Sequence, residues 1–143
     1  MAKVIIVDDS AFMRGSLKSL IEHDGHHVVG MASNGLEAVE LYKKIKPDLV
    51  TMDVIMKEMN GIEALKAIIE YDPNARVIMI TSLIQQQIEN NFQQIGACGL
   101  IKKPFANDEV IKEVQRVLGL HALRALRAAP AKARIEIKDE RMA

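Results

Sequence analysis

Carboxylates placed at the ends of apolar runs are the residues of this sequence with the clearest chemical potential. Asp8 and Asp9 directly follow the β-branched run 3–7, and Asp53 stands inside the apolar run 49–56. Burying a carboxylate without a partner is costly, so a charge where an apolar strand ends needs a compensating group or a function. We therefore expect other parts of the chain to supply compensating groups.

Two further apolar runs end in groups that could compensate these charges. Thr81 follows the run 77–80 and offers a hydroxyl, and Lys103 follows the run 99–102 and offers an ammonium. A polar residue after a single strand is usually ordinary loop polarity. Four strand ends that bring polar groups to one edge of a parallel sheet indicate a ligand site instead.

The elements that must position these residues follow a repeated strand–helix pattern. Five short apolar runs are predicted strands, namely 3–7, 28–32, 49–52, 77–80 and 99–102. Each is followed by a segment with helical periodicity, namely 11–24, 36–46, 62–71, 85–95 and a last helix capped by Asn107. Apolar strands that alternate with amphipathic helices predict a parallel sheet covered on both faces. We therefore expect an α/β, flavodoxin-like, doubly wound five-stranded parallel sheet of order 2-1-3-4-5 with five flanking helices.

The same patterns assign helix caps and buried helix faces. Ser10 suits the N-cap of the first helix, because its hydroxyl can accept a hydrogen bond from a backbone N–H of the first turn. The residues expected on the buried faces of the first two helices are Phe12, Leu17, Leu20 and Ile21, and Leu36, Val39 and Ile45.

Three carboxylates gathered at one edge of the sheet would repel one another unless a cation lies among them. Oxygen ligands without a nearby His or Cys favour Mg²⁺ (or Mn²⁺) over zinc. A divalent cation, the Lys103 ammonium and the Thr81 hydroxyl around one carboxylate would form a site for a phosphoryl group. Asp53 would then be the nucleophile and would form an aspartyl phosphate.

These motifs resemble those of a known family. The segments Val7-Asp8-Asp9-Ser10, Thr81-Ser82 and Lys103-Pro104-Phe105, with Asp53 at its spacing, are similar to the receiver domain of two-component response regulators of the CheY-like single-domain type. The resemblance covers about residues 3–118. We therefore expect a receiver domain over residues 1–118 and a C-terminal extension over residues 119–143.

The resemblance implies a role for each matching residue. It makes Asp53 the phosphoacceptor, Thr81 the switch hydroxyl and Lys103 a contact of the phosphate. The implied metal ligands are Asp8 (through water), Asp9, Asp53 and the backbone carbonyl of Ile55. The family usually has a cis peptide bond in this lysine–proline pair, so we expect one between Lys103 and Pro104.

Five positions near the site differ from the usual family pattern. Lys57 replaces a proline, Asn60 an acidic residue and Leu100 an aromatic that turns inward on activation. Ile55 and Leu83 are apolar where a polar side chain could orient an attacking water. We therefore predict slow loss of phosphate, because apolar groups exclude water, and a readout that does not use an aromatic switch.

Composition excludes several other classes of protein. The formal net charge is zero and aromatic residues are 3% of the chain, so we expect no direct contact with nucleic acid. A single cysteine fits a reducing cytoplasm, and no apolar run reaches the roughly 18 residues that a membrane span needs.

The expected partners are other proteins. The resemblance implies a histidine kinase or a phosphotransfer domain as the phosphoryl donor. It also implies a downstream protein target that binds the amide-rich Gln85–Ile95 helix, strand five and the last helix. The same surface could serve a homodimer. The extension over 119–143 is basic, with six Lys/Arg and three Asp/Glu, and we expect a continued helix followed by a partly disordered tail.

The leading hypothesis is a response regulator that signals by protein–protein contact, with chemotaxis as the first expected output. A phosphorelay intermediate and a pseudo-receiver that is never phosphorylated are the alternatives. A hydrolase with an aspartyl-phosphate intermediate is less favoured, because such enzymes place a second Asp where Ile55 stands. We expect self-catalysed phosphotransfer and slow autodephosphorylation rather than enzymatic turnover.

Overall fold

The computed structural model describes residues 1–82 and 86–128, with the side chains of 86–89 and 120–128 excepted. Strands and helices alternate strictly along these residues. The five strands are β1 (Lys3–Val7), β2 (His27–Ala32), β3 (Leu49–Asp53), β4 (Val77–Thr81) and β5 (Gly99–Lys102). The five helices are α1 (Ala11–His23), α2 (Gly35–Ile45), α3 (Gly61–Tyr71), α4 (Gln86–Ile95) and α5 (Asn107–Ala128).

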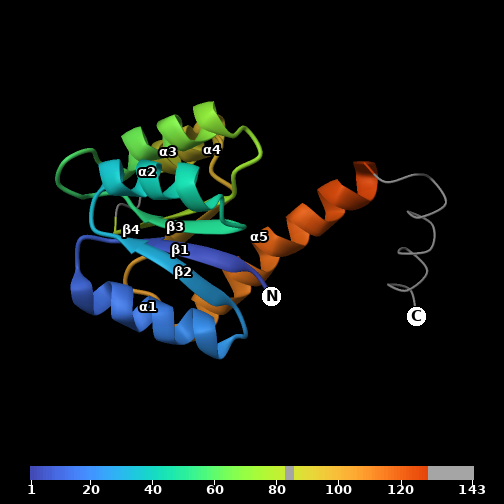
Figure 1. Cartoon of the computed structure of the whole chain (residues 1–143), viewed down its shortest axis with the longest axis horizontal. Helices are drawn as coiled ribbons and strands as arrows, with labels where there is room; N and C mark the ends of the chain where they lie inside the picture. Colours follow the sequence, from blue (N-terminus) through green and yellow to red (C-terminus); the bar gives the residue numbers. More distant parts are fainter. Residues whose placement is uncertain (83–85, 129–143) are drawn as a thin grey trace.

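The strands form one parallel sheet in the order β2-β1-β3-β4-β5, which confirms the predicted flavodoxin-like topology. Helices α2, α3 and α4 cover one face of the sheet, and α1 and α5 cover the other (Figure 1). Because all strands run in the same direction, their carboxyl ends lie at one edge of the sheet, where an open α/β fold binds its ligands.

The two faces of the sheet have separate apolar cores. On one side, side chains such as Val50 and Met79 of the sheet meet Leu65 of α3 and Phe92 of α4. On the other side, Ile6 and Ile78 meet residues of α1 and α5. Strands β3 and β4 are buried along their whole length, as expected for the centre of a doubly covered sheet.

Several predicted element boundaries differ from the structure by one residue, among them the end of β3 and the start of α5. β3 includes Asp53, which pairs with Ile80, so the carboxylate belongs to the last residue of the strand itself. α5 begins at Asn107, and Ala106 precedes it with its backbone N–H donating to a Glu109 carboxylate oxygen at 3.1 Å. The predicted cap at Ser10 is confirmed, since its side chain accepts the Met13 N–H.

Two residues predicted on buried helix faces lie in solvent. Phe12 is 83% exposed and Leu36 is 47% exposed. The face of α1 that meets the sheet is centred on Leu17 and Ile21 and leaves position 12 outside it. In α2 the buried face includes Tyr42, and Leu36 lies outside that face. The helical spacing of the apolar residues was predicted correctly, but packing against the sheet determines which side of each helix is buried.

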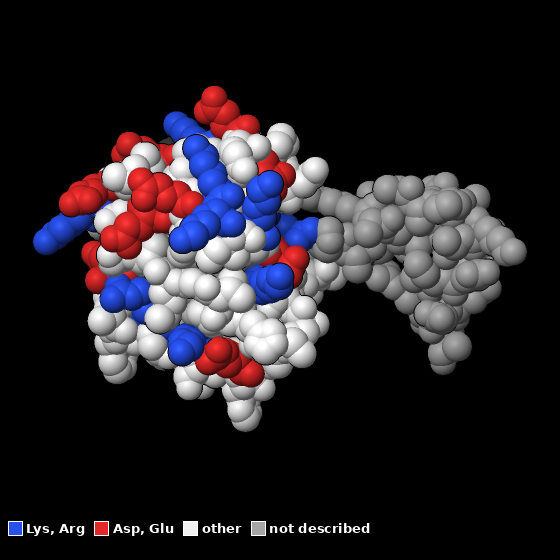
Figure 2. Space-filling view, viewed as in Figure 1, with Lys and Arg blue, Asp and Glu red and all other residues white. Residues whose placement is uncertain are grey.

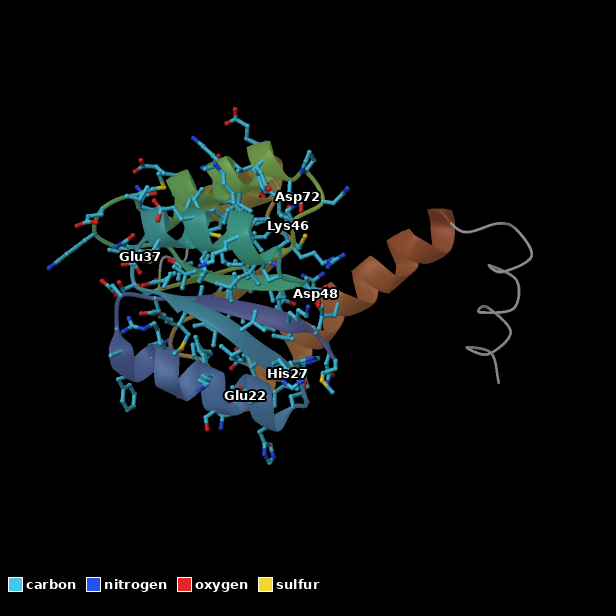
Figure 3. The ribbon with its side chains drawn as sticks, viewed as in Figure 1. Glu22, His27, Glu37, Lys46, Asp48 and Asp72 are labelled. Carbon is cyan, nitrogen blue, oxygen red and sulfur yellow. The ribbon has the colours of Figure 1, made fainter. Side chains whose placement is uncertain are left out.

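Charged side chains mark both ends of the molecule. Glu37 in the first turn of α2 lies at the end where the strands finish, whereas Asp48 and Asp72 lie at the opposite end (Figure 3). Acidic and basic side chains are interspersed over the face seen in Figure 2 rather than separated by sign. In the described part of the chain, no helix is long and apolar enough to cross a membrane.

α5 continues well beyond the body of the fold and projects from it (Figure 1). Its first turns pack on the sheet through Val110, Val114 and Val117. A Cβ at Gly119 would meet no atom within 4 Å, so this position of the helix faces open space. α5 continues past Gly119 to Ala128, and the predicted tail over 129–143 lies outside the described residues.

Candidate functional site

Residues from four strand ends meet at the carboxyl edge of the sheet. Asp8 follows β1 directly, and Asp53 ends β3; the two strands are neighbours and Val7 pairs with Met52. Thr81 ends β4, and Lys103 follows β5. The sheet therefore brings together residues that are up to 95 positions apart in the sequence.

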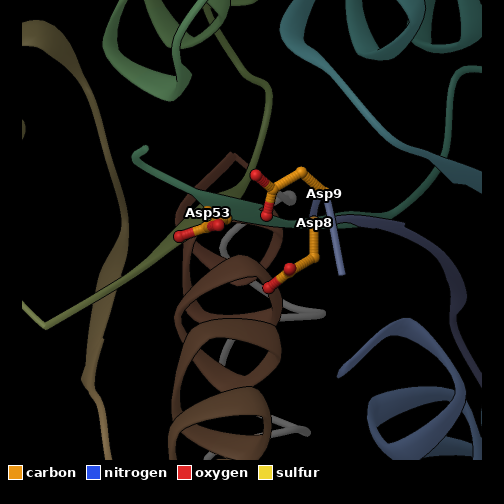
Figure 4. A group of neighbouring side chains, drawn as sticks. All are labelled: Asp8, Asp9 and Asp53. Atoms are coloured by element: carbon orange, nitrogen blue, oxygen red, sulfur yellow. The ribbon is translucent and has the colours of Figure 1, made fainter. Parts of the chain in front are cut away.

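Three carboxylates form the centre of this site (Figure 4). One oxygen from each of Asp8, Asp9 and Asp53 lies within 4.8 Å of the other two. Asp8 and Asp53 are buried, at 1% and 7% exposure, whereas Asp9 is exposed. Carboxylate oxygens at such spacing, open to solvent on one side, are the donors that Mg²⁺ or Mn²⁺ prefers. The residues present therefore fit a hard divalent cation.

Lys103 bridges two of the carboxylates. Its Nζ lies 3.2 Å from Asp8 Oδ2 and 3.5 Å from Asp53 Oδ1. Its backbone N–H donates to the Thr81 carbonyl at 2.8 Å, which ties the ends of β4 and β5 together. The peptide bond between Lys103 and Pro104 is cis, as expected. The ammonium is thereby fixed between the end of β1 and the end of β3.

Asp8 is bonded through each of its polar groups. Its backbone N–H donates to the Ala32 carbonyl at 3.1 Å, and its Oδ1 accepts the Ser10 N–H at 2.9 Å. Its Oδ2 accepts from Lys103 Nζ, and its backbone carbonyl accepts from Arg14 Nη1 at 2.7 Å. The sequence patterns did not single out Arg14, because a basic residue inside a helix carries no signal of the carbonyl it will reach.

The charge of Asp53 is only partly compensated. Burial raises the pKa of Asp53 above the ordinary aspartate value of 3.8, and the neighbouring Asp8 raises it further. Lys103 acts in the opposite direction, but it is shared with Asp8 and does not offset both effects. A divalent cation at this position would remove the repulsion and favour the ionised, nucleophilic carboxylate.

The loop between β3 and α3 brings backbone close to Asp53. A Cβ on Gly61 would lie 2.1 Å from the Asp53 carbonyl oxygen, so only glycine allows α3 to begin here. Within this loop Glu58 and Met59 have left-handed φ values of 52° and 82°. Ile55, two residues after Asp53 in this loop, is 62% exposed.

The structure describes four of the five positions that differ from the usual receiver pattern. Leu100 is half-buried in β5, and Lys57 lies exposed in the β3–α3 loop. Asn60 accepts the Glu63 N–H at 3.0 Å and caps α3, which fits its predicted turn role. Leu83 lies outside the described residues.

A half-buried carboxylate, Glu113, lies away from the acidic cluster, on the β5–α5 side. Glu113 Oε2 accepts the backbone N–H of Leu100 at 2.9 Å, and Glu113 Oε1 lies 2.6 Å from Arg116 Nε. Arg116 also donates to the Cys98 carbonyl at 2.8 Å. Burial alone would raise the pKa of Glu113, but its bonds from Arg116 and Leu100 lower it on balance. A cavity of about 370 Å³ lies beside these contacts between β5 and α5.

A cavity of about 410 Å³ adjoins Lys103 on the side of α1. Its lining includes Met13, Ser82 and Phe105. It lies between α1 and the loop after β5.

The comparisons with known proteins agree with this geometry. The family model for the response regulator receiver domain matches residues 4–115. The chain is 48% identical over 115 residues to the chemotaxis protein CheY of Thermotoga maritima, covering 80% of this chain and 96% of that protein. It is 44% identical over 119 residues to Protein CcdB of Bacillus subtilis, covering 83% and 99%.

A solved structure supports the same assignment. A chain in the crystal structure of the CheX–CheY–BeF₃–Mg²⁺ complex from Borrelia burgdorferi matches with a TM-score of 0.80 and 38% identity, over 81% of this chain and 88% of that chain. The parallel sheet of order β2-β1-β3-β4-β5, the acidic cluster at its carboxyl edge and these matches lead to one conclusion. The chain belongs to the response regulator receiver domain family and is CheY-like.

Proposed function

We propose that Asp53 is the phosphoacceptor of this receiver and takes its phosphoryl group from the phosphohistidine of a histidine kinase or a phosphotransfer domain. A carboxylate oxygen of Asp53 forms the new P–O bond while the P–N bond of the phosphohistidine breaks. The departing imidazole nitrogen keeps the bonding electrons and takes up a proton from solvent. The observation that carries this proposal is the cluster of three carboxylate oxygens within 4.8 Å, with Lys103 3.5 Å from Asp53.

The other site residues have distinct roles in this proposal. Asp9 and Asp53 would hold Mg²⁺ (or Mn²⁺) directly, Asp8 through water, and the backbone carbonyl of Ile55 would complete the protein ligands. When bound, the cation supplies positive charge to the transferring phosphoryl oxygens. It would also relieve the repulsion that raises the pKa of Asp53. The relative from Borrelia burgdorferi was crystallised with Mg²⁺ and BeF₃, which supports this ligand assignment.

Lys103 and Thr81 would act on the product side of the transfer. Lys103 already lies between Asp8 and Asp53, so its ammonium can contact a phosphate on Asp53 after a small shift. The Thr81 side chain ends the neighbouring strand, and its hydroxyl would bond a phosphoryl oxygen and move its loop. The backbone bond from Lys103 to Thr81 would couple that movement to the end of β5.

The output would be contact with another protein. We propose that α4, β5 and α5 form the contact surface, on which Asn90, Asn91, Gln93 and Gln94 expose neutral side chains. The similarity to CheY proteins favours chemotaxis in the cytoplasm as the output, and one such protein was crystallised with CheX. Residues 1–118 would form the receiver and 119–143 an extension. A phosphorelay intermediate is the second candidate, because Leu100 and Lys57 differ from the usual pattern.

The experiment that tests the proposal is phosphorylation with acetyl phosphate and Mg²⁺, followed by intact-protein mass spectrometry. We expect about one phosphoryl group per chain in wild type. We expect no phosphorylation when Mg²⁺ is chelated before the donor is added, and at least a 100-fold slower reaction in Asp53→Asn. Glu113→Gln serves as the matched control, because it removes the charge of a half-buried carboxylate away from the site. Turnover of acetyl phosphate without accumulation would indicate a hydrolase, and no modification in wild type would indicate a pseudo-receiver.

The lifetime of the phosphate on Asp53 tests the role of the apolar residues Ile55 and Leu83. Ile55 is large, exposed and only two residues after Asp53, so it would keep an attacking water from taking an ordered position. We expect the phosphorylated Ile55→Asn, Leu83→Glu variant to lose phosphate at least several-fold faster than wild type, measured by mass spectrometry after the donor is removed. A wild-type phosphate that decays markedly faster than that of the variant would refute this role.

A further inference from the structure

Arg14 makes a contact with the acidic cluster that the phosphoryl chemistry does not use. It lies on α1, six positions after Asp8, and its Nη1 donates to the Asp8 backbone carbonyl at 2.7 Å. This carbonyl stands at the point where β1 ends and the chain turns toward α1. The bond therefore ties the second turn of the helix to the end of the strand.

The contact matters most for Asp9, because the Asp8 carbonyl belongs to the peptide bond that leads into Asp9. Asp8 itself is held by Ser10, Lys103 and Ala32 in addition to Arg14. The Asp9 carboxylate makes no hydrogen bond or ion pair with the described residues, and it is exposed. Its position among the three carboxylates thus depends on the backbone that precedes it.

We propose that Arg14 is a positioning residue for the cation site: by holding the Asp8 carbonyl it fixes the backbone that places the Asp9 carboxylate within reach of Asp8 and Asp53. The proposal rests on the proposed cation site. Arg14 touches neither the phosphoryl group nor the cation in this role. It acts through a neutral backbone oxygen, and arginine is suited to this because its guanidinium has several donors on a planar group.

The positive charge of Arg14 should affect Mg²⁺ affinity in the opposite direction to its positioning contact, which makes the proposal testable. A positive side chain near the site repels a divalent cation, so removing the charge should tighten Mg²⁺ binding if charge alone matters. Removing a positioning contact should weaken Mg²⁺ binding, because the ligand oxygens then lose their fixed arrangement. The two effects can be separated by comparing Arg14 with a nearby cation that has no such contact.

Lys18 provides this matched control. It lies one turn further along α1 and is half-buried like Arg14, but it makes no hydrogen bond or ion pair with the described residues. The three variants to compare with wild type are Arg14→Met, Arg14→Lys and Lys18→Met. Arg14→Met removes charge and donor, Arg14→Lys keeps both in a different shape, and Lys18→Met removes only charge.

The measurement is Mg²⁺ affinity by isothermal titration calorimetry on the full chain without any phosphoryl donor. We expect about 5- to 20-fold weaker binding for Arg14→Met, partial recovery for Arg14→Lys, and unchanged or slightly tighter binding for Lys18→Met. Amide NMR spectra of the same samples should show changes at Ser10 and Asp9 in Arg14→Met and intact signals for β4 and β5. These spectra also show that the variant is folded.

The outcomes separate this inference from the proposed function. If wild type binds no Mg²⁺, the cation site and the proposed function fail together. If wild type binds Mg²⁺ and Arg14→Met binds it equally or more tightly, the positioning role alone is overturned. If Arg14→Met and Lys18→Met weaken binding equally, the contact with the Asp8 carbonyl has no specific role and the inference is again wrong. Should Arg14→Met not fold, Arg14→Gln, which keeps a shorter neutral donor, replaces it with the same expected direction.

Discussion

Asp53 and Glu113 are two carboxylates withdrawn from solvent in the same fold, and their pKa values move in opposite directions. Asp53 ends the central strand β3, next to Asp8, and shares Lys103 with it. Burial raises its pKa, and Asp8 adds to that rise. Glu113 lies on α5, where burial also opposes its charge, but Arg116 and the Leu100 N–H lower its pKa on balance.

The comparison separates a carboxylate that stabilises the fold from the one to which the proposed function assigns the chemistry. Glu113 has two donors of its own and covers the outer edge of β5, so its charge contributes to stability. Gly99 makes room for it, because a Cβ there would lie 2.8 Å from Glu113 Oε2. Among the described residues Asp53 has no donor of its own, and this deficit would leave its oxygens available to a cation and a phosphoryl group.

The largest effect is expected when the ammonium of Lys103, which Asp8 and Asp53 share, is removed. Lys103→Met leaves Asp8 and Asp53 buried side by side without their ammonium, and we expect a loss of about 2–3 kcal/mol in the free energy of unfolding at neutral pH. Denaturant unfolding measures it. Lys66→Met on the exposed side of α3 is the control and should change stability little. If Lys103→Met is as stable as the control, the ammonium does not hold the acidic cluster together.

The next effect tests the stabilising carboxylate. Glu113→Gln keeps the shape but weakens the bonds to Arg116 and to Leu100, and we expect a loss of about 1–2 kcal/mol. Lys112→Gln, which breaks the exposed contact with Asp108 at 3.6 Å, should cost much less. Because the folded pKa of Glu113 is lowered, its contribution is present above the unfolded value of about 4.5 and disappears as pH falls through the folded pKa. Equal losses in the two variants would contradict the assignment.

The functional carboxylate should behave in the opposite way. Asp53→Asn removes an uncompensated charge, and we expect the apoprotein to gain about 1 kcal/mol at neutral pH. The folded pKa of Asp53 is raised above 3.8, so protonated Asp53 favours the folded state. That favourable contribution is complete below 3.8 and is lost as pH rises through the folded pKa. The advantage of Asp53→Asn should therefore grow over the same pH range and vanish in acid.

Unfolding curves of wild type and Asp53→Asn between pH 3.5 and 8, without Mg²⁺, measure this difference. Added Mg²⁺ should stabilise wild type more than Asp53→Asn, because the variant lacks one ligand charge. A variant that is less stable than wild type at neutral pH would show that Asp53 is compensated after all.

The smallest effect concerns the neutral hydroxyl of Thr51, which belongs to β3 like Asp53. Thr51 is fully buried in β3, and its Oγ1 has no hydrogen-bond partner among the described residues. Thr51→Val replaces the hydroxyl by a methyl group of similar size, and we expect a gain of about 0.5–1 kcal/mol with unchanged phosphorylation. Thermal unfolding measures it. A loss of stability or of phosphorylation would mean that the hydroxyl has a partner or a role that the structure does not show.

Much of the fold follows from the sequence because its patterns are local. The alternation of five apolar runs with five amphipathic segments was enough to predict a doubly wound parallel sheet, since few topologies bury such a pattern. The position of Asp8, Asp53 and Lys103 just at or after these runs then placed them at one edge. The sequence determined the site to this extent through strand direction alone.

The tertiary structure decided what local patterns leave open. Phe12 and Leu36 have the right type and period for burial, but the sheet covers other positions of their helices. The contacts of Arg14 and Glu113 depend on which backbone groups remain unpaired once the strands are ordered, and no spacing in the sequence encodes that.

The two carboxylates compared above show the same division. Asp53 was conspicuous in the sequence because a charge ends an apolar strand, and this signal needs no knowledge of its neighbours. Glu113 looks like any charged residue of a helix surface, and only the packing of α5 on β5 gives it two donors. The identity of a charge is local, whereas its pKa depends on burial and on partners that folding brings from elsewhere in the chain.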